Sequence, residues 1–591
     1  MTKISTFLLG VALAVTSFSN AQIQLNRIGG YETGLFDEGA SEIVSYSSTN
    51  QYLYSVNSGD VTIDIISLID PTNPTKIKSV DAKLYGGSAN AVAVGEDYFV
   101  VAIENADSTQ YNGTLEFFDL NGNHIVSIPA GALPDNVNIS PDGKYVVAAN
   151  EGEPSDSYNH DPEGTITVVN MASGVNSISS IDATQINFQS YNGKSIEGGI
   201  VNHNPGTSTV AQDLEPEYVA FDENSETAFV VCQENNVVAK VDLATITLDT
   251  IIGLGFKDWS TTDGFDASNK SKVVNFHNWN VYGVYQPDAM AGFNIAGTDY
   301  LFTANEGDGR DYTGFEGEAR VKDLDLNTSI FSMTDIQNDT LLGRLKVHAG
   351  LGLNPSTSKY DSLYAYGARS FSIWKASDMS LVFDSESMIE KKVYETNPLN
   401  FNATNDETGF KDRSDDKGPE PEAITVGMVG SKYYAFVGLE RHGGVMTFDV
   451  TDVNNVSFVD YTNYRDFDAD PTTSAAGDLG PECVLFVPKA ETSHGNDLLI
   501  VANEVSGSIS IFEILDGTNS STNLVGEQFS VYPNPTSNFL KFSRVNDYLI
   551  FDFSGKLVKT VLQSDRTDVS NLANGIYTIK SGAETATFVK K

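Results

Sequence analysis

The sequence has few cysteines and, after its first residues, no long apolar run. Its 591 residues include 2 cysteines, Cys232 and Cys483, which both fall within runs that we predict to be core strands. We therefore interpret them as small buried hydrophobes and not as a disulfide. No later apolar run approaches the roughly 18 residues of a membrane helix, so we expect no transmembrane segment. His/Cys clusters with zinc spacing are also absent, which argues against a structural zinc site.

Basic residues are scarce as well. Lys and Arg number 36 against 79 Asp and Glu, and the formal net charge is −43. A surface with this balance repels the phosphates of nucleic acids and anionic lipids, whereas it attracts divalent cations. We therefore exclude nucleic acid as a partner. Most carboxylates on such a chain are expected to be a solvated acidic surface.

The two ends of the chain have the composition of processing segments. Residues 1–21 contain Lys3, the apolar run FLLGVALAV and Ser19-Asn20-Ala21, the pattern of an export signal with its cleavage site. Residues 515–526 are a polar Ser/Thr/Asn linker. The linker separates the body of the chain, residues 22–514, from a small C-terminal domain, residues 527–591.

Helical periodicity is scarce, and short β-branched runs bounded by Gly, Asn, Asp and Pro recur through the body. The chain is therefore predicted to be all-β. Eight repeat units of about four strands each can be counted, which favours a β-propeller. Seven blades remain possible if one irregular unit is not a full blade, and an array of β-sandwiches is the alternative fold. We predict that residues 23–33 supply the outer strand that the last unit lacks, and so close the ring.

Acidic residues recur in phase with these units. If the first two strands of a unit form a hairpin, the start of the first strand and the end of the second lie together. Residues that open first strands are Glu217, Asp288, Glu422 and Glu482. Residues that close second strands are Glu104, Glu151, Glu234, Glu306, Glu440 and Glu504. In a propeller, all ten would crowd one mouth of the central channel.

A ring of carboxylates at one mouth predicts a divalent cation site. Ca²⁺ takes 6 to 8 oxygen ligands, so we favour Ca²⁺ bound by Glu151, Glu217, Glu234, Asp288, Glu306, Glu422, Glu440, Glu482 and Glu504. The alternative is structural. The carboxylates would then accept hydrogen bonds from backbone N–H groups of the next blade and lock neighbouring blades together.

Several of the few cations lie beside these acidic motifs. Arg310 follows Glu306, Arg369 stands where the sixth unit would have its glutamate, and Arg441-His442 follow Glu440. Arginine suits phosphate, and metal ions next to arginines are the components of phosphoester hydrolysis, with a carboxylate or His442 as general base. The alternative is that each arginine pairs with a neighbouring carboxylate and offsets its repulsion.

The C-terminal segment resembles the sorting domain of the type IX secretion system. The resemblance rests on Tyr532-Pro533-Asn534-Pro535, the Gly555 turn, the run 572–577 (LANGIY) and the terminal lysines. It implies handling by the type IX machinery and passage across the outer membrane. The domain would then be removed or exchanged for a surface anchor, which leaves the protein extracellular or attached to the cell surface.

The body resembles the choice-of-anchor I family of exported propeller proteins. The motifs that carry the resemblance are 149–154 (ANEGEP), 214–217 (LEPE), 303–308 (TANEGD), 318–322 (EARVK), 367–373 (GARSFSI) and 418–422 (GPEPE). Members of that family are often labelled alkaline-phosphatase-like, and their relatives include cell-surface glycoproteins without known catalysis.

Two functions therefore compete. One is a secreted, metal-dependent hydrolase of small phosphoesters, which the placement of the arginines favours narrowly. The other is a surface propeller that holds Ca²⁺ for rigidity and recognises a glycan or a protein through its loops, a function that this fold commonly hosts. The long segments around 181–212 and 258–286 are predicted to be either binding edges or loops packed by their own aromatic residues.

Overall fold

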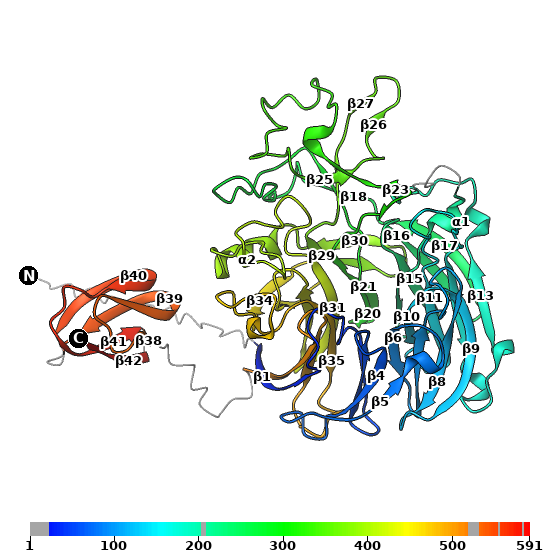
Figure 1. The fold of residues 1–591 in the computed structure, drawn as a ribbon, viewed down its shortest axis with the longest axis horizontal. Helices are drawn as coiled ribbons and strands as arrows, with labels where there is room; N and C mark the ends of the chain where they lie inside the picture. Colours follow the sequence, from blue (N-terminus) through cyan, green and yellow to red (C-terminus); the bar gives the residue numbers. More distant parts are fainter. Residues whose placement is uncertain (1–22, 202–207, 518–530, 553–555, 582–583) are drawn as a thin grey trace, which may run out of the picture. The chain divides into compact units, whose positions relative to one another are not determined.

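The computed structural model describes residues 23–201, 208–517, 531–552, 556–581 and 584–591, so the predicted signal peptide lies outside it. The chain divides into two compact units, Met1–Asp516 and Gly517–Lys591. Strands dominate both units (Figure 1), and the α-helices of the described residues are short: α1 (Val210–Asp213) and α2 (Met388–Thr396). Within the described part of the chain, no helix has the length and apolar character needed to cross a membrane.

Seven four-stranded antiparallel sheets make up most of the described part of the first unit. Blade 1 contains β2 (Val44–Ser47), β3 (Tyr52–Asn57), β4 (Thr62–Ser67) and β5 (Thr75–Asp81). Blade 2 contains β6 (Ala89–Val94), β7 (Tyr98–Ile103), β8 (Asn112–Asp119) and β9 (His124–Ala132). Blade 3 contains β10 (Pro134–Ile139), β11 (Tyr145–Asn150), β12 (Thr165–Asn170) and β13 (Ala183–Asn187). Blade 4 contains β14 (Tyr218–Phe221), β15 (Thr227–Cys232), β16 (Val237–Asp242) and β17 (Thr247–Gly253).

The remaining three blades follow the same order, with one strand taken from the N-terminal segment. Blade 5 contains β20 (Met290–Ile295), β21 (Thr298–Asn305), β29 (Ser370–Lys375) and β30 (Ser380–Asp384). Blade 6 contains β31 (Pro421–Val429), β32 (Lys432–Leu439), β33 (Val445–Asp449) and β34 (Ser457–Thr462). Blade 7 contains β35 (Pro481–Val487), β36 (Leu498–Asn503), β37 (Ser508–Asp516) and β1 (Ile23–Glu32).

The second strands explain why the apolar runs are continuous and do not alternate. Every residue of β7 (YFVVAI) and β36 (LLIVAN) is buried. A second strand lies inside its sheet and packs against neighbouring blades on both faces, so both sets of side chains must be apolar or small. The blades thus share hydrophobic cores, as where residues of blades 3 and 4 form one cluster.

The ring is closed. Each first strand contacts the first strand of the next blade in the order β2, β6, β10, β14, β20, β31 and β35, and β35 contacts β2. The N-terminal strand β1 pairs antiparallel with β37, from Ile23 opposite Asp516 to Glu32 opposite Ser508. This pairing confirms that the N-terminal segment completes the last blade, so one sheet joins the two ends of the ring.

Of the two blade counts that the sequence allows, eight and seven, the described residues form seven. The counted sixth unit is not a separate blade, because β29 pairs with β21, with Asn305 opposite Ser370. It is the third strand of blade 5, separated from the second by residues 306–369. The sequence predicted that Arg369 closes a second strand, and this prediction is wrong. Arg369 lies directly before a third strand.

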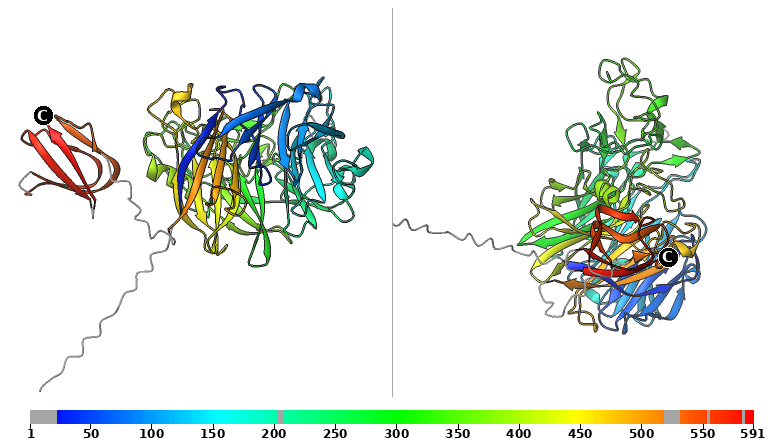
Figure 2. Two further views of the ribbon diagram at one scale, coloured as in Figure 1. Left: turned by 90° about the horizontal axis from the view of Figure 1, so that it is seen from below. Right: turned by 90° about the vertical axis from the view of Figure 1, so that its left-hand side faces the viewer.

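The insertion in blade 5 builds a sheet of its own together with the segment that precedes the blade. Its strands are β18 (Phe256–Asp258), β19 (Tyr282–Val284), β24 (Glu318–Arg320), β25 (Lys346–His348) and β28 (Tyr364–Ala365). Two hairpins add β22 (Asp311–Tyr312), β23 (Phe315–Glu316), β26 (Leu353–Asn354) and β27 (Lys359–Tyr360). Trp259 and Trp279 are 1% and 3% exposed in its core. The insertion extends beyond the ring in Figure 1 and in the right-hand view of Figure 2.

The second unit is small, and the secondary structure of its described part consists of β-strands. They are β38 (Val531–Tyr532), β39 (Phe539–Phe551), β40 (Leu557–Asp568), β41 (Gly575–Ser581) and β42 (Glu584–Lys590). The long strand β39 pairs with β38, β40 and β41. Its own apolar cluster includes Tyr548, Ile579 and Phe588. This unit has the size and the all-β character predicted for the C-terminal domain.

Candidate site at the channel mouth

One mouth of the central channel is an acidic cavity of about 500 Å³. It forms where first strands begin and second strands end, as the hairpin geometry predicts. The carboxylates that line it are Glu42, Glu104, Asp135, Glu153, Glu217, Asp288, Glu482 and Glu504. The described residues that line this cavity include no lysine, arginine or histidine. The mouth therefore concentrates negative charge with no basic side chain on the cavity wall.

Carboxylates from different blades come close enough to share a cation. In three groups, one oxygen from each member lies within 4.8 Å of the oxygens of the others: Glu151/Glu217/Glu234, Asp288/Glu422/Glu482 and Glu306/Glu422/Glu440. We call these clusters A, B and C. Glu422 belongs to both B and C. Of the nine carboxylates that the sequence proposed as ligands, eight lie in these clusters, and the ninth, Glu504, lines the cavity.

Clusters A and B each contain an oxygen without a hydrogen-bond partner. Glu234 and Glu422 are 6% and 8% exposed, and Oε2 of each accepts no hydrogen bond from the described residues. Glu217 Oε2 accepts a hydrogen bond from the backbone N–H of Gln233 at 3.0 Å, but both residues belong to the first hairpin of blade 4, so this bond does not join neighbouring blades. A buried carboxylate oxygen without a partner is costly, so a cation or a hydrogen-bond donor at the unpartnered oxygens of Glu234 and Glu422 would be stabilising.

Burial and mutual repulsion shift the acidity of these groups. Burial is the largest cause that raises the pKa of Glu422 well above its usual value, and the negative charges of Glu440 and Glu482 raise it further. Burial, together with Glu104 and Glu153, raises the pKa of Asp135 to about 7. Like charges that cannot all ionise either hold protons or gain a counter-ion. The mouth therefore favours any cation that neutralises it.

β-Bulges turn the acidic residues toward the mouth. In β10 and β35 the register shifts between Pro134 and Asn136 and between Pro481 and Cys483, which leaves Asp135 and Glu482 without a partner in the ladder. A shift between Pro421 and Ile424 frees Glu422 in the same way. A bulge re-aims the side chain of the extra residue. A Pro-acid dipeptide thus coincides with a bulge at the start of β10, β31 and β35, whereas β14 and β20 follow such a dipeptide without a register shift.

Arg310 is committed to carboxylates of its own chain. It is 5% exposed, and its Nη1 donates to Asp213 Oδ1 at 2.5 Å. Its Nε donates to Glu215 Oε2 at 3.1 Å. This pairing is the alternative that the sequence left open for the arginines. Arg310 neutralises two buried acids at the start of blade 4.

Arg369 is also buried, at 3% exposure, between blade 5 and the loop that precedes blade 6. Its Nη1 donates to Glu390 Oε1 at 2.9 Å and to the Asp266 carbonyl at 3.1 Å. Its Nη2 donates to the carbonyls of Ser414 and Asp416 at 2.8 and 2.7 Å. The guanidinium thus holds that loop in place.

Arg441 lies at the mouth, whereas the next residue, His442, lies in the core. Arg441 has a side chain that is 30% exposed, and its Nη2 lies 2.9 Å from Glu440 Oε1. His442 is fully buried, and its Nδ1 lies 2.7 Å from the hydroxyl of Tyr461. Burial, followed by the charge of Arg465, lowers the pKa of His442 to about 3. His442 is therefore a neutral core residue near neutral pH.

Lys417 is a cation at the mouth that the sequence prediction missed. Its Nζ pairs with Glu306 of cluster C and lies 3.4 Å from Glu420 Oε2 and 3.8 Å from Asp308 Oδ1. Burial favours the neutral form of Glu420, but Lys417, Arg413 and Arg441 outweigh it and lower the pKa of Glu420 to about 2. Lys417 lies in the motif 417–422 (KGPEPE), from which the sequence pattern predicted only Glu422 as a ligand.

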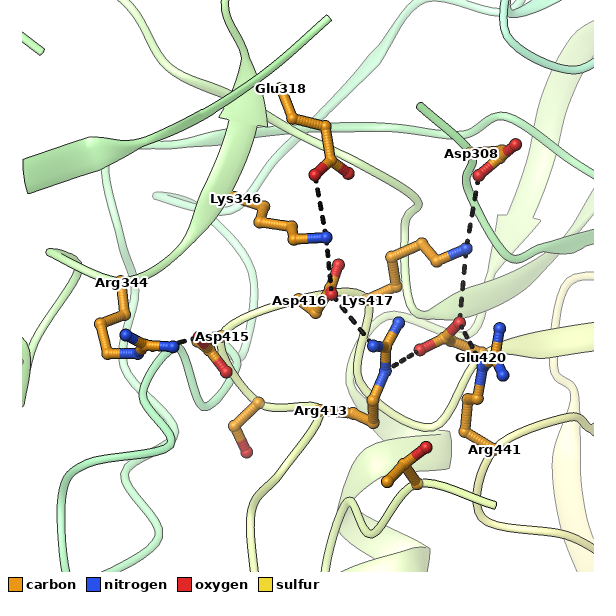
Figure 3. Close-up of polar contacts among 12 residues, drawn as sticks. Asp308, Glu318, Arg344, Lys346, Arg413, Asp415, Asp416, Lys417, Glu420 and Arg441 are labelled. Carbon is orange, nitrogen blue, oxygen red and sulfur yellow. Dashed lines mark hydrogen bonds and ion pairs between the residues drawn. The ribbon is translucent and has the colours of Figure 1, made fainter. Parts of the chain in front are cut away.

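These residues belong to a longer network of ion pairs that reaches the inserted sheet (Figure 3). Lys346 Nζ lies 2.8 Å from Glu318 Oε2 and 3.2 Å from Asp416 Oδ2. Arg413 continues the network, with Nη1 at 3.1 Å from Asp416 and Nε at 2.6 Å from Glu420. Charged contacts therefore connect the insertion to the acidic mouth.

Four further acids that line the mouth, Glu42, Glu104, Asp135 and Glu153, were not among the predicted ligands, although Glu104 was expected at the mouth. Glu42 and Asp135 open the first and third units in the sequence, so the signal that selected Glu217 was present for them too. Glu153 lies beyond the strand end and accepts a hydrogen bond from the hydroxyl of Tyr312 at 2.8 Å. The position of Glu153 depends on a loop, which the strand pattern does not predict.

The fold and the mouth define a class: a seven-bladed β-propeller, closed by its N-terminal strand, with an acidic cavity at one end of its channel. Residues 42–453 match the Choice-of-anchor I domain family. This match covers well over half of the chain, and the chain belongs to that family. Residues 530–591 match the Secretion system C-terminal sorting domain.

The sorting domain decides where the protein goes. Its match confirms the prediction that the type IX secretion machinery handles the chain. The protein is exported to the cell surface or the extracellular space.

Two animal proteins share sequence with parts of the chain. Gigasin-3a of Magallana gigas is 30% identical over 195 residues, which is 30% of this chain and 66% of the relative. The Mesenchyme-specific cell surface glycoprotein of Strongylocentrotus purpuratus is 24% identical over 398 residues, which is 56% of this chain and 46% of the relative. The chain thus spans less than two thirds of the length of either relative.

The solved structures that align with this chain share little sequence identity with it. The hydrazine synthase of Kuenenia stuttgartiensis aligns over 82% of this chain and 99% of its own, at 12% identity and a TM-score of 0.41. A Streptogramin B lyase aligns over 84% and 98%, at 9% identity and a TM-score of 0.40. The β-propeller domain of Myceliophteria_thermophila Cps50 (Swd1) aligns over 83% and 100%, at 8% identity and a TM-score of 0.39.

Proposed function

We propose that this surface propeller binds divalent cations, Ca²⁺ first, at its channel mouth, and that the loaded mouth serves recognition of a glycan or protein. The observation that supports this is the convergence of carboxylates from different blades within 4.8 Å, together with the unpartnered oxygens of Glu234 and Glu422. Hard oxygen ligands without nitrogen or sulfur suit Ca²⁺. A bound ion would replace repulsion between blades with a shared attraction.

Recognition is favoured over catalysis because two of the candidate arginines already pair with carboxylates of this chain and are not free to bind a phosphoryl group. The guanidinium groups of Arg310 and Arg369 are buried in contacts with their own chain. The name of one relative, a cell surface glycoprotein, is in keeping with a role in surface contacts.

Calcium titration of the chelated full chain tests the proposal. We expect saturable binding, and a stabilisation of about 2.7 kcal/mol per site at 100 times the dissociation constant. Glu482→Gln removes a ligand of cluster B and should weaken that site at least tenfold. The matched control is Glu395→Gln, on a side chain that is 61% exposed on α2. Calorimetry that detects no Ca²⁺ binding, or equal binding by both variants, would contradict the proposal.

A second candidate is metal-dependent hydrolysis of small phosphoesters. Glu422 is shared by clusters B and C, and a carboxylate between two ion sites is a feature of hydrolytic centres with two metals. The ions would activate water and polarise the phosphoryl group. Arg441, which is partly exposed beside Glu440, would contact a phosphoryl oxygen.

An assay on an aryl phosphomonoester, with and without Ca²⁺, tests this candidate. We expect Glu422→Gln to abolish turnover and Arg441→Met to lower kcat/KM about tenfold or more, as loss of one anion contact would. Lys432→Met, which removes an ion pair with Asp449, is the control. An absence of turnover in protein that demonstrably binds Ca²⁺ would eliminate the hydrolase.

A further inference from the structure

The three carboxylate clusters differ in how their charge is neutralised. In cluster C, Glu306 pairs with Lys417, and Glu440 pairs with Arg441 at 2.9 Å. Over the described ranges, no ion pair involves a member of cluster A, or Asp288 and Glu482 of cluster B. Cluster C thus has ion-pair partners from its own chain, whereas no described lysine or arginine forms an ion pair with a carboxylate that belongs only to A or B.

Lys417 is positioned to act as a fixed cation. The residue is 8% exposed, and its ammonium lies among the carboxylates of Glu306, Glu420 and Asp308. An ammonium group has three donors and no acceptor, so three surrounding carboxylates suit it. Lys417 donates to Oε1 of Glu306, and Gln233 Nε2 donates to Oε2 at 2.9 Å, so both oxygens of this cluster C carboxylate have partners.

The backbone holds this lysine in place. Gly418, the next residue, has a φ of 75°, which a residue with a side chain rarely adopts. Glu420 then receives Arg413 at 2.6 Å and Arg441 at 3.3 Å (Figure 3). The ion pairs of Glu420 therefore anchor the loop next to the lysine and favour one position of its backbone.

We propose that Lys417 is the built-in cation of cluster C, so that divalent cations bind at clusters A and B only. This inference rests on the proposed cation binding at the mouth. A divalent ion in cluster C would lie next to the paired ammonium and be repelled by it, whereas the carboxylates of cluster A, and Asp288 and Glu482 of cluster B, form no ion pair with a described cation. Lys417 thus sets the number of ions that the mouth takes.

The test counts the Ca²⁺ ions bound per full-length chain by equilibrium dialysis of the wild type and of Lys417→Met. Methionine keeps the length and the apolar stem of lysine but removes the ammonium. We expect about two ions in the wild type and about three in the variant, because Glu306 of cluster C loses its ammonium partner and the partly exposed Arg441 is the cation that remains paired with the cluster. Lys432→Met, the same substitution in a surface pair, should leave the number at about two.

The outcomes separate this inference from the proposed function. An unchanged number in a folded Lys417→Met protein overturns the inference while Ca²⁺ binding stands. Binding by Lys417→Met alone overturns both Ca²⁺ binding by the wild type and the assignment of ions to clusters A and B, and no binding by either protein also overturns both. If Lys417→Met does not fold, Glu306→Gln and Glu482→Gln decide. The inference requires that Glu306→Gln lose no ion and that Glu482→Gln lose one.

Discussion

In the presence of a chelator, raising the pH from about 5 to about 8 is expected to lower the free energy of unfolding by about 3 kcal/mol or more. The acids responsible are Glu42, Asp135 and Glu504 at the mouth. Burial, the largest cause, and neighbouring carboxylates raise the pKa of each to about 7. The folded protein therefore binds more protons than the unfolded chain between about pH 4 and pH 7. Stability is highest below this window and falls as the pH rises through it.

Saturating Ca²⁺ should flatten this dependence, because the ion supplies the positive charge that protons supply at low pH. Denaturant unfolding across the pH range, with Ca²⁺ or with chelator, measures both effects. Stability of the chelated protein that is constant or increases from pH 5 to 8 would contradict the assigned charge repulsion.

Replacing Arg310 with methionine is expected to cost about 3–5 kcal/mol of stability, among the largest effects of any single side chain at the mouth. The arginine is 5% exposed and neutralises Asp213 and Glu215. Its removal leaves two buried carboxylates without their cation. Denaturant unfolding measures the loss, and Lys432→Met, at a surface pair, should cost less than about 1 kcal/mol.

The triple variant Arg310→Met/Asp213→Asn/Glu215→Gln distinguishes lost charge pairing from lost packing. Because the penalty comes mainly from the unpaired carboxylates, their neutral amides should recover a large part of the stability. A triple variant that is no more stable than Arg310→Met would show that the arginine acts through its packing.

The strand ends and the bulges together explain why one mouth is acidic. Hairpin geometry brings the start of one strand next to the end of the next, and seven blades repeat this around the channel. At β10, β31 and β35, a bulge then frees the acidic residue from the ladder. At these three strands, the Pro-acid dipeptide in the sequence therefore coincides with the bulge in the backbone.

The fold was predictable to the level of the blade. Continuous apolar runs at the second strands, and the missing outer strand of the last unit, predicted a propeller closed by its N-terminus, and β1 pairs with β37 as expected. The error was local. The run SFSIWK has the composition of a strand and was counted in a unit of its own, but it pairs with β21 across an insertion. Composition predicts that a run is a strand and not which strand it joins.

The sequence by itself determined most of the strands, the sorting segment, and the placement of acidic residues in phase at strand ends, because each of these depends on short stretches of chain. Only the tertiary structure decided which carboxylates share a cluster and which cations they already have. Lys417 and Glu306 are far apart in the sequence and meet because blades 5 and 6 are neighbours. Pairing of buried charges depends on distances across the closed ring, which no local pattern records.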